Sequence, residues 1–570
     1  MNYIRYFLYG ALVVAALLLW NAWQQEHQNV VTKPTTPAVQ QPQQIPTAPT
    51  QQTQQTQQTQ QAQIPAQVAS RKVPTINKSR IINVKTDVLD VDIDTLGGNI
   101  VKTSLLKYPK ELKSKEPFLL LNYNPDTLYT SQSGLLVSGQ KTPQPLSYKT
   151  SQKSFVLAEG QKQLVVTLQA VNQEGIKITK NYIFKPNKYN IAFNIKATNN
   201  TSKVWNGSYY MQFTRTATPP TKKGTFSLRS FFGIAISSKD DPYQKFYFKK
   251  LDKKPIDQDI KGGWLAMVQH YFIGAWIPDP QTIYHYYSSV NNDGTYTAGI
   301  VSSMLAINPG KSVDINANFY TGPKIAKRLG VIAPFLAKTV DYGFLWFIAI
   351  ILFKVMKFFY QIIGNWGWSI IAVTILIKLI FYKLSASSYK SMAGMRKLQP
   401  KMARLKEQYA GNKQALSKAT MELYRKEKIN PLGGCLPILI QIPVFFALYW
   451  VLLESVELRQ APFIFWIHDL SVKDPYYVLP ILMGISMYLQ QKLTPMSPDP
   501  TQAKMMMFLP VVMTVFFLNF PAGLVLYWLV NNVVSVAQQW YIMRKFEHGG
   551  YKHHHEKKPW WTKWFPPKGR

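Results

Sequence analysis

A lysine inside an apolar segment is the residue in this sequence with the clearest chemical meaning. Lys378 follows the uncharged run IIAVTILI in the segment from 366 to 382. A cation at bilayer depth costs about 2.5 to 3.5 kcal/mol on insertion scales, so a residue of this kind is by default functional. The alternative, in which its four methylenes lift the ammonium to the nearer interface, stays open.

Other polar residues recur at helical spacing in the neighbouring apolar segments. Thr374 lies one turn before Lys378 on the same helix face, and Gln441 interrupts a second segment. A segment near the carboxyl end adds Asn531, Asn532, Ser535, Gln538 and Gln539. Ordinary interhelical hydrogen bonding also explains such amides. Together with Lys378, these residues predict a wetted polar cavity inside a helix bundle, open toward the cytoplasm.

A hydrolytic interpretation of Lys378 has little support. A buried lysine beside the hydroxyls of Thr374 and Ser369 suggests a Ser/Lys dyad in which the amine acts as a base. Such a dyad belongs near the outer surface of the membrane, whereas Lys378 approaches the inner one. We therefore expect no catalytic residue.

Metal and phosphate motifs also fail on inspection. Asp90, Asp92 and Asp94 imitate a calcium loop, but the glycine and glutamate that the loop requires are missing. We interpret these aspartates as the solvated face of a strand. We expect no metal, no other cofactor and no small-molecule substrate.

Length, composition and charge place the chain among membrane proteins. Its 570 residues are 46% hydrophobic and include a single cysteine, Cys435, which excludes a small disulfide-stapled scaffold. The formal net charge is +36, from 65 Lys and Arg against 29 Asp and Glu. Positive charge of this size suits nucleic acid, anionic lipid or cytoplasmic loops, so its position along the chain decides its meaning.

The first 75 residues predict a membrane anchor followed by a tether. Residues 1–25 include an uncharged run about as long as the 20 residues that a bilayer requires. A cleaved signal peptide is the alternative, but Trp20 and Trp23 stand where a cleavage site has small residues. Residues 26–75 are rich in Gln, Thr and Pro and bury too little surface to fold.

Residues 76–335 show the two-residue period of half-buried strands. Leu89, Val91 and Ile93 alternate with aspartates, and similar runs follow between the turn signals GG, NPD, NPG and NND. No convincing helical pattern interrupts them. We predict one large β-sandwich on the outer side of the membrane.

The carboxyl-terminal region alternates apolar and basic runs, which predict its topology. The basic stretch 383–430 should stay in the cytoplasm as a helical hairpin broken at Gly411 and Asn412. If both preceding apolar stretches crossed the membrane, this hairpin would share a side with the β-sandwich. Residues 336–364 carry Lys354 and Lys357 on one side, so we assign them to an interfacial helix.

Five spans then form the region 365–543, at about 366–382, 433–453, 476–491, 505–519 and 523–541. With the N-terminal anchor they make six, and both termini lie in the cytoplasm. The tail at 544–570 is basic and aromatic. The tail and hairpin suit either ribosomal RNA or the headgroups of anionic phospholipids, and both interpretations stay open.

Several long stretches resemble one family. The run from Asn430 to Gly484 beginning NPLGGCLPILIQIPVFF, the NWGWSI at 365–370 and the FPAGLVLYW at 520–528 closely resemble the YidC membrane protein insertases of Gram-negative bacteria. These belong to the wider YidC/Oxa/Alb superfamily. VKTDVLDVDIDTLGG at 84–98 and YPKEL at 108–112 resemble the start of the family's periplasmic domain. The resemblance covers essentially the whole chain except the linker and tail.

The resemblance implies a fold and a site. The fold is a polytopic α-helical membrane protein with six transmembrane helices, five of them forming the insertase core, and a large periplasmic β-supersandwich domain. Lys378 falls where the family keeps a groove cation, commonly arginine, and Thr374 falls at a polar groove position. Tyr527 and Trp528 fall at positions that contact incoming segments. With the polar residues above, the predicted substrate groove comprises Lys378, Thr374, Gln441, Tyr527, Trp528, Asn531 and Asn532.

The resemblance also implies a function and partners. The family inserts and helps fold integral proteins of the bacterial inner membrane, alone or with the Sec translocon, through a hydrophilic groove open to cytoplasm and lipid. The implied partners are nascent membrane proteins, Sec components, the ribosome and anionic phospholipids.

Two other classes compete with this interpretation. A secondary transporter would bind an anion at Lys378 and predicts internal repeats, of which we find none. A glycan-binding or sugar-processing envelope protein would use the β-sandwich, but we find no paired carboxylates for it.

Overall fold

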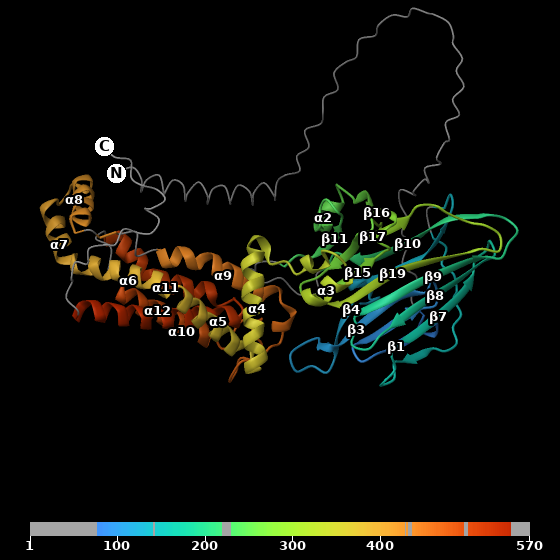
Figure 1. Cartoon of the computed structure of the whole chain (residues 1–570), viewed down its shortest axis with the longest axis horizontal. Coiled ribbons are helices and arrows are strands. Elements are labelled where there is room, and N and C mark those ends of the chain that lie inside the picture. Colours follow the sequence, from blue (N-terminus) through green and yellow to red (C-terminus); the bar gives the residue numbers. More distant parts are fainter. Residues whose placement is uncertain are drawn as a thin grey trace, which may run out of the picture. The chain divides into compact units, whose positions relative to one another are not determined.

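The computed structural model describes residues 77–548 except 141–142, 219–229, 428, 431–435 and 495–499. The predicted anchor at 1–25, the linker at 26–75, Cys435 and the tail beyond 548 lie outside the described residues. Two parts of the described chain differ in kind, a β-rich part from 81 to 323 and a helical part from 346 to 548. We call the first the β-domain and the second the helix bundle (Figure 1).

The larger sheet of the β-domain has eleven strands in the order β13-β16-β17-β10-β5-β3-β2-β1-β6, with β18 beside β10 and β4 beside β3. These strands are β1 (Ile81–Lys85), β2 (Leu89–Asp94), β3 (Asn99–Pro109), β4 (Pro117–Leu121), β5 (Tyr129–Val137), β6 (Ser154–Val156), β10 (Trp205–Thr216), β13 (Asp257–Lys261), β16 (Ile283–Val290), β17 (Thr295–Ser302) and β18 (Leu305–Ile307). The pairing is antiparallel except between β1 and β6.

The second sheet has eight strands in the order β12-β11-β14-β15-β19-β9-β8-β7. They are β7 (Leu164–Val171), β8 (Ile176–Phe184), β9 (Asn190–Asn199), β11 (Gly233–Ser237), β12 (Gln244–Phe246), β14 (Trp264–Val268), β15 (Phe272–Ile277) and β19 (Ser312–Pro323). Burial alternates along β7, β8 and β9, as expected where one face packs on a core and the other meets water.

The two sheets face each other across one hydrophobic core. Phe213 of β10 and Phe319 of β19 bring their rings to 5.9 Å, and Trp276 Nε1 of β15 donates to Ser131 Oγ of β5 at 2.9 Å. The β-domain also contains the short helices α2 (Phe248–Leu251) and, after the last strand, α3 (Ala326–Ile332). The large sandwich expected from the two-residue period is thus present as a β-rich domain.

The aspartates of β2 are not the solvated face that the sequence predicted. Asp92 and Asp94 are buried. Arg80 Nε lies 3.2 Å from Asp94 Oδ1, and Lys102 Nζ lies 3.3 Å from Asp92 Oδ2. The prediction was wrong because β2 lies inside the sheet, between β1 and β3, where neighbouring chain supplies a cation for each carboxylate.

The helix bundle contains nine described helices. They are α4 (Trp346–Ile363), α5 (Trp366–Ile380), α6 (Tyr382–Lys397), α7 (Gln399–Gln408), α8 (Lys413–Lys426), α9 (Leu436–Glu454), α10 (Val478–Leu493), α11 (Pro500–Phe517) and α12 (Ala522–His548). Contacts of α12 with α5, α6 and α10 and of α4 with α5 and α9 hold the bundle together.

Helix α4 runs across α5, α9 and α12 rather than along them (Figure 1). It ends at Gly364, whose φ of 74° suits glycine, and many of its large apolar side chains are exposed, among them Trp346, Ile351 and Phe358. This segment is the one that the sequence assigns to an interfacial helix.

Length and hydropathy do not establish the predicted six spans. Among the described helices, the segment Gly343–Ile363 alone has the length and hydropathy of a single crossing. A second candidate combines α5 with α6 and α7, and it is bent by 67°. Leu439–Glu454 and Lys504–Phe517 are apolar but shorter.

The stretch predicted as a two-helix hairpin contains three helices. Helix α6 follows α5 after a bend at Phe381, and α7 and α8 are separated by a turn in which Gly411 has a φ of 88°. Asn412 caps α8 by accepting from the backbone N–H of Ala415 at 2.9 Å. The break near Gly411 and Asn412 thus lies at the predicted place, while the extra break between α6 and α7 was not predicted.

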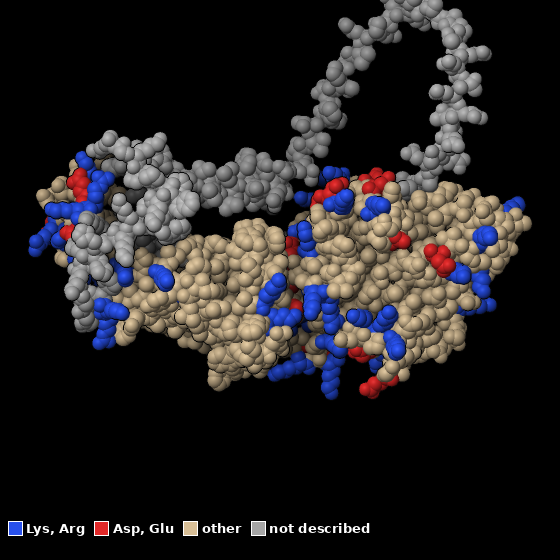
Figure 2. All heavy atoms as spheres, viewed as in Figure 1, with Lys and Arg blue, Asp and Glu red and all other residues tan. Residues whose placement is uncertain are grey.

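The side of the bundle seen in Figure 2 has a broad band without charged residues, and Lys and Arg gather around α7 and α8. Exposed apolar side chains of α10 and α11 make up part of the bundle surface: Ile481, Leu482, Ile485, Leu489, Phe508, Val511, Val512 and Val515. A continuous apolar surface of this kind is typical of contact with lipid.

Candidate functional site

The ammonium of Lys378 lies inside the helix bundle. Helix α5 begins beside Asn365, whose side chain accepts from the backbone N–H of Trp368 at 3.2 Å. The helix then carries Lys378 into its last turn, where the residue is only 7% exposed. The carboxyl end of a helix favours a cation, because the unpaired carbonyls there carry partial negative charge.

Two neighbouring helices supply oxygen atoms to this ammonium. Its Nζ donates to Ser535 Oγ of α12 at 2.6 Å and lies 3.4 Å from Gln441 Oε1 of α9. An ammonium has three donors. Among the described residues, no carboxylate forms an ion pair with Lys378, so the charge is held by neutral groups alone.

Thr374 is buried one turn earlier on the same helix, where the sequence predicted it. Its Oγ1 donates to the carbonyl of Ile370 at 2.7 Å, within α5 itself. The hydroxyl proton is therefore used locally, and the lone pairs of Thr374 remain as acceptors.

The predicted asparagines of α12 are buried, and one of them contacts a residue that the sequence reasoning missed. Asn532 Nδ2 donates to Ser486 Oγ of α10 at 3.1 Å. The carbonyl of Asn531 accepts from Ser535 Oγ at 2.7 Å. Ser486 is a small polar residue two positions after Gly484 in an apolar helix, and that was the only signal in the sequence. We call Lys378, Gln441, Ser486, Asn532 and Ser535 the polar cluster.

Further amides of α12 lie next to the polar cluster with unused hydrogen-bonding atoms. Gln538 Nε2 is 3.4 Å from the carbonyl of Lys378, but its Oε1 has no partner among the described residues. Both amide atoms of Gln539 are likewise buried without a partner in that part of the chain. A buried polar group left unpaired costs about 1–3 kcal/mol, so these atoms are available to a polar ligand.

The two predicted aromatic residues pack against other rings. Trp528 lies 4.7 Å from Phe445 and 5.2 Å from Phe517, measured between ring centroids. Tyr527 is fully buried, with its ring 6.4 Å from that of Phe445. Both residues therefore belong to one aromatic group with Phe445, and Trp528 is the more exposed of the two.

Two family models match the chain, and together they span most of it. The model described as the YidC periplasmic domain matches residues 81–355, and that described as the 60Kd inner membrane protein matches residues 358–549. The membrane protein insertase YidC of Coxiella burnetii (strain Dugway 5J108-111) is 49% identical over 553 residues, covering 96% of this chain and 97% of the relative. This chain belongs to the YidC family of membrane protein insertases. The YidC insertase of Legionella pneumophila (strain Paris) is 46% identical over 550 residues, covering 96% of this chain and 98% of that one.

A solved YidC structure also aligns with the chain. A crystal structure described as an active YidC insertase with the first transmembrane domain resolved matches with a TM-score of 0.37 and 19% sequence identity. The match covers 82% of this chain and 93% of that chain.

The β-domain of this YidC family member contains a second buried lysine, which the sequence reasoning also missed. Lys180 of β8 is 0% exposed and bridges the two sheets. Its Nζ donates to the carbonyls of Gly97 at 2.7 Å and Ser133 at 2.6 Å, and lies 3.2 Å from Ser133 Oγ. Burial lowers the pKa of its ammonium from 10.5 to about 7.

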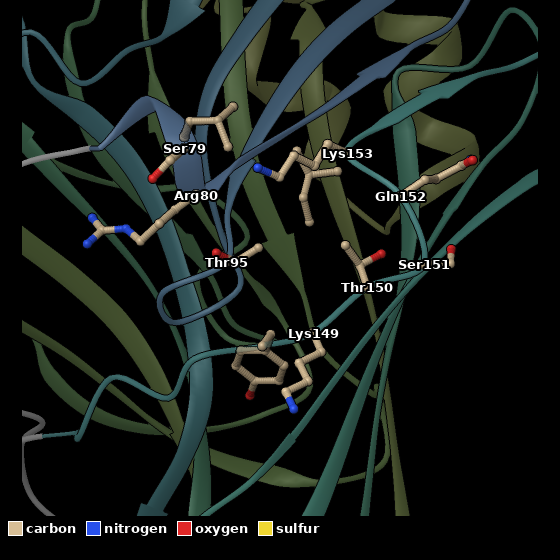
Figure 3. A pocket seen from close by; sticks show the side chains of 11 residues that line it. Ser79, Arg80, Thr95, Lys149, Thr150, Ser151, Gln152 and Lys153 are labelled. Atoms are coloured by element: carbon tan, nitrogen blue, oxygen red, sulfur yellow. The ribbon is translucent and has the colours of Figure 1, made fainter.

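A shallow basic hollow of about 470 Å³ lies on the β-domain near the start of β1. Figure 3 shows Arg80, Lys149 and Lys153 around Thr95 and Thr150. Its lining residues include no Asp, Glu or His. The hollow therefore lacks the paired carboxylates that sugar hydrolysis requires, and it lends no support to a sugar-processing function.

Proposed function

We propose that this chain inserts newly made proteins into the bacterial inner membrane and that the polar cluster is the place where their polar flanks enter the bilayer. The observation that carries this proposal is the ammonium of Lys378, buried in an apolar helix bundle and held by Ser535 and Gln441 without a carboxylate. The relatives from Coxiella burnetii and Legionella pneumophila are named membrane protein insertases, and this name gives the arrangement its context.

The physical task is to bring a polar flank past hydrocarbon. A bundle that is polar inside and open to the cytoplasm shortens the apolar distance that the flank must cross. The hydrophobic segment meanwhile moves along the apolar surface of α10 and α11 and partitions into lipid. Transfer of an apolar helix into lipid is favourable, and the membrane potential helps acidic flanks outward, so no nucleotide is required.

Lys378 acts in this proposal as the attractive charge for acidic flanks. A lysine supplies a point charge without the planar fork of the arginine common in the family, so it attracts a carboxylate without a bidentate geometry. Thr374, Gln441, Asn531 and Asn532 keep the groove polar, and Tyr527 and Trp528 form its aromatic wall.

The proposed topology has six spans with both termini in the cytoplasm and the β-domain in the periplasm. Helix α4 lies in the outer interface and α5, α9, α10, α11 and α12 cross the membrane. Support comes from the basic residues at α7 and α8, which the positive-inside rule assigns to the cytoplasm, and from the charge-free band of the bundle (Figure 2).

The proposed partners follow from the same charges. The basic hairpin and tail bind the ribosome by salt-sensitive phosphate contacts and bind anionic phospholipids beside the bundle. The Sec translocon is a further proposed partner.

The proposal is tested by photocrosslinking to a stalled nascent membrane protein on ribosomes. The photoreactive residue replaces Gln441, which is partly exposed beside Lys378, and in the control it replaces Ile481 on the outer apolar surface. We expect the polar flank of the substrate to crosslink from position 441 and not from 481. Crosslinks from 481 alone would mean that substrates bypass the polar cluster.

A further inference from the structure

A buried ion pair joins the β-domain to the end of helix α9. Lys324 directly follows the last strand, β19, and Glu454 is the last residue of α9. Lys324 Nζ lies 2.9 Å from Glu454 Oε2, and each side chain is 1% exposed. Neither residue belongs to the polar cluster, and 130 positions separate them in the sequence.

Other contacts converge on the segment 453–459, which we call the seat. His270 Nε2 donates to the carbonyl of Leu453 at 2.7 Å, and Tyr342 OH lies 3.2 Å from Ser455 Oγ. Arg459 Nη2 donates to the carbonyls of Pro109 at 2.7 Å and Lys110 at 3.0 Å. The seat is therefore held by the turn between β14 and β15, by the end of β3 and by the segment before α4.

Among the described residues, Lys324 is the side chain that forms an ion pair with Glu454. Burial lowers the pKa of His270, so its imidazole is neutral and the charge of Glu454 is left to Lys324. A buried pair of this kind adds little to stability, because desolvation offsets the attraction. Loss of one partner is costly, because the other charge stays buried and unpaired. The pair thus favours the one position of the β-domain relative to the end of α9 in which both charges are paired.

Helix α9 links this seat to the polar cluster. Gln441, whose Oε1 lies 3.4 Å from Lys378 Nζ, is about 20 Å along the helix from Glu454. Helix α9 is continuous from Leu436 to Glu454, and Pro443 removes one hydrogen bond without interrupting the helix. The position of Gln441 therefore depends on how the far end of α9 is held.

We propose that Lys324 and Glu454 form a latch through which the β-domain positions α9, and with it Gln441, in the polar cluster. Both are positioning residues, since neither contacts Lys378. The latch gives the β-domain a role in the geometry of the groove. The inference rests on the proposed function for its meaning. Its test measures only the geometry of the groove, so a failure of the latch and a failure of the proposed function can be told apart.

The test uses full-length protein in inverted membrane vesicles, with Cys435→Ser and a single probe cysteine. Gln441→Cys reports on α9, and Ser535→Cys reports on α12, which makes no hydrogen bond to the β-domain among the described residues. The rate at which a water-soluble maleimide labels each probe cysteine is measured in protein with the native Lys324 and Glu454, and again with Glu454→Gln or Lys324→Met. We expect at least a threefold change at 441 and less than a twofold change at 535.

Two further variants separate positioning from general damage. The exchange Lys324→Glu with Glu454→Lys keeps both charges, and we expect it to return labelling at 441 to within twofold of the starting rate. Lys324→Met with Glu454→Leu buries no charge, so we expect it to fold even where a single variant does not accumulate, and to keep the altered rate. Lys401→Met, which breaks an exposed pair with Glu427, is the matched control.

Three outcomes overturn the latch. The rate at 441 stays unchanged in both the single and the neutral double variants, the rates at 441 and 535 change equally, or the charge exchange fails to restore the rate at 441. A change confined to 441 that the exchange reverses establishes it.

Discussion

Two of the three lysines buried among the described residues, Lys180 in the β-domain and Lys378 in the helix bundle, are held by neutral oxygen atoms alone, and their surroundings differ. Lys180 Nζ has two backbone carbonyls within 2.7 Å and the Ser133 hydroxyl at 3.2 Å, so its three donors are satisfied. Lys378 has one short contact, to Ser535, and a long one, to Gln441. An ammonium whose three donors are all used (a saturated one) stabilises the fold. An ammonium with an unused donor (an undersaturated one) can still bind a ligand.

The largest expected effect is on stability, and it comes from replacing Lys180, whose three donors are all used. Lys180→Met removes the donor from the carbonyls of Gly97 and Ser133, and each unpaired buried group costs about 1–3 kcal/mol. We expect the β-domain to lose about 3 kcal/mol of unfolding free energy. Urea unfolding followed by tryptophan fluorescence and by limited proteolysis measures the loss. A variant as stable as the parent would mean that Lys180 is not a structural tie.

The control for this prediction is the pH dependence of the unfolding free energy, compared between the parent and Lys180→Met. The folded-state pKa of Lys180, about 7, lies below its ordinary value of 10.5, so the unfolded chain binds more protons between these values. Stability from this group therefore rises with pH across that window and is constant below it. We expect the stability gap between parent and Lys180→Met to widen from pH 7 to pH 10; a gap that narrows contradicts the assignment.

The next prediction concerns Lys378, whose ammonium keeps an unused donor. Lys378→Glu reverses the charge in the polar cluster, and we expect insertion of substrates with acidic flanks to fall at least about tenfold, the equivalent of about 1.4 kcal/mol. Lys378→Arg keeps the charge and should insert them normally. Complementation of a depletion strain and insertion into proteoliposomes measure the difference. Normal growth with Lys378→Glu would eliminate this role.

A smaller effect on insertion is expected when the short contact of Lys378 is removed. Ser535→Ala deletes one hydrogen bond to a charged group, so we expect a loss of about 1.5–3 kcal/mol at most, and less where another oxygen replaces the serine. Insertion of acidic-flank substrates should be kept or increased, because the ammonium gains a free donor. Thermal unfolding and the insertion assay are measured together, and a strong loss of insertion without loss of stability would make Ser535 itself part of the substrate contact.

The smallest expected effect lies on the surface of the hairpin. Lys401 and Glu427 pair at 2.6 Å, but both are partly exposed. We expect Lys401→Met to change stability by no more than about 1 kcal/mol, as is usual for exposed pairs. A larger loss would indicate that α7 and α8 depend on this contact, and thermal unfolding at low and high salt distinguishes the two cases.

Local patterns in the sequence predicted much of this arrangement. The two-residue period indicated the β-domain, and the lone cation in an apolar run indicated Lys378. The same period contained a signal for Lys180 that was not used: it shares the inward face of β8 with Ile176, Ile178, Tyr182 and Phe184. A lysine on the apolar side of a strand is as informative as one in an apolar helix.

Other features depend on distant pairs and had no local signal. Glu454 ends an apolar helix, and its partner Lys324 is 130 positions away in another domain, so neither residue alone indicated an ion pair. The aspartates of β2 were misassigned for the same reason, because Arg80 and Lys102 reach them from other elements. The predicted number of spans also exceeds what helix length alone supports among the described residues.

The bend between α5 and α6 has a mechanical consequence. Helix α6 extends about 24 Å beyond Phe381, whereas Lys378 lies about 5 Å before it. For a rigid rotation about this pivot, displacement scales with distance, so a swing of the outer end of α6 reaches Lys378 reduced about fivefold. The joint works as a reduction lever: where the outer end of α6 is displaced by ångströms, the charge at the short end moves by tenths of an ångström.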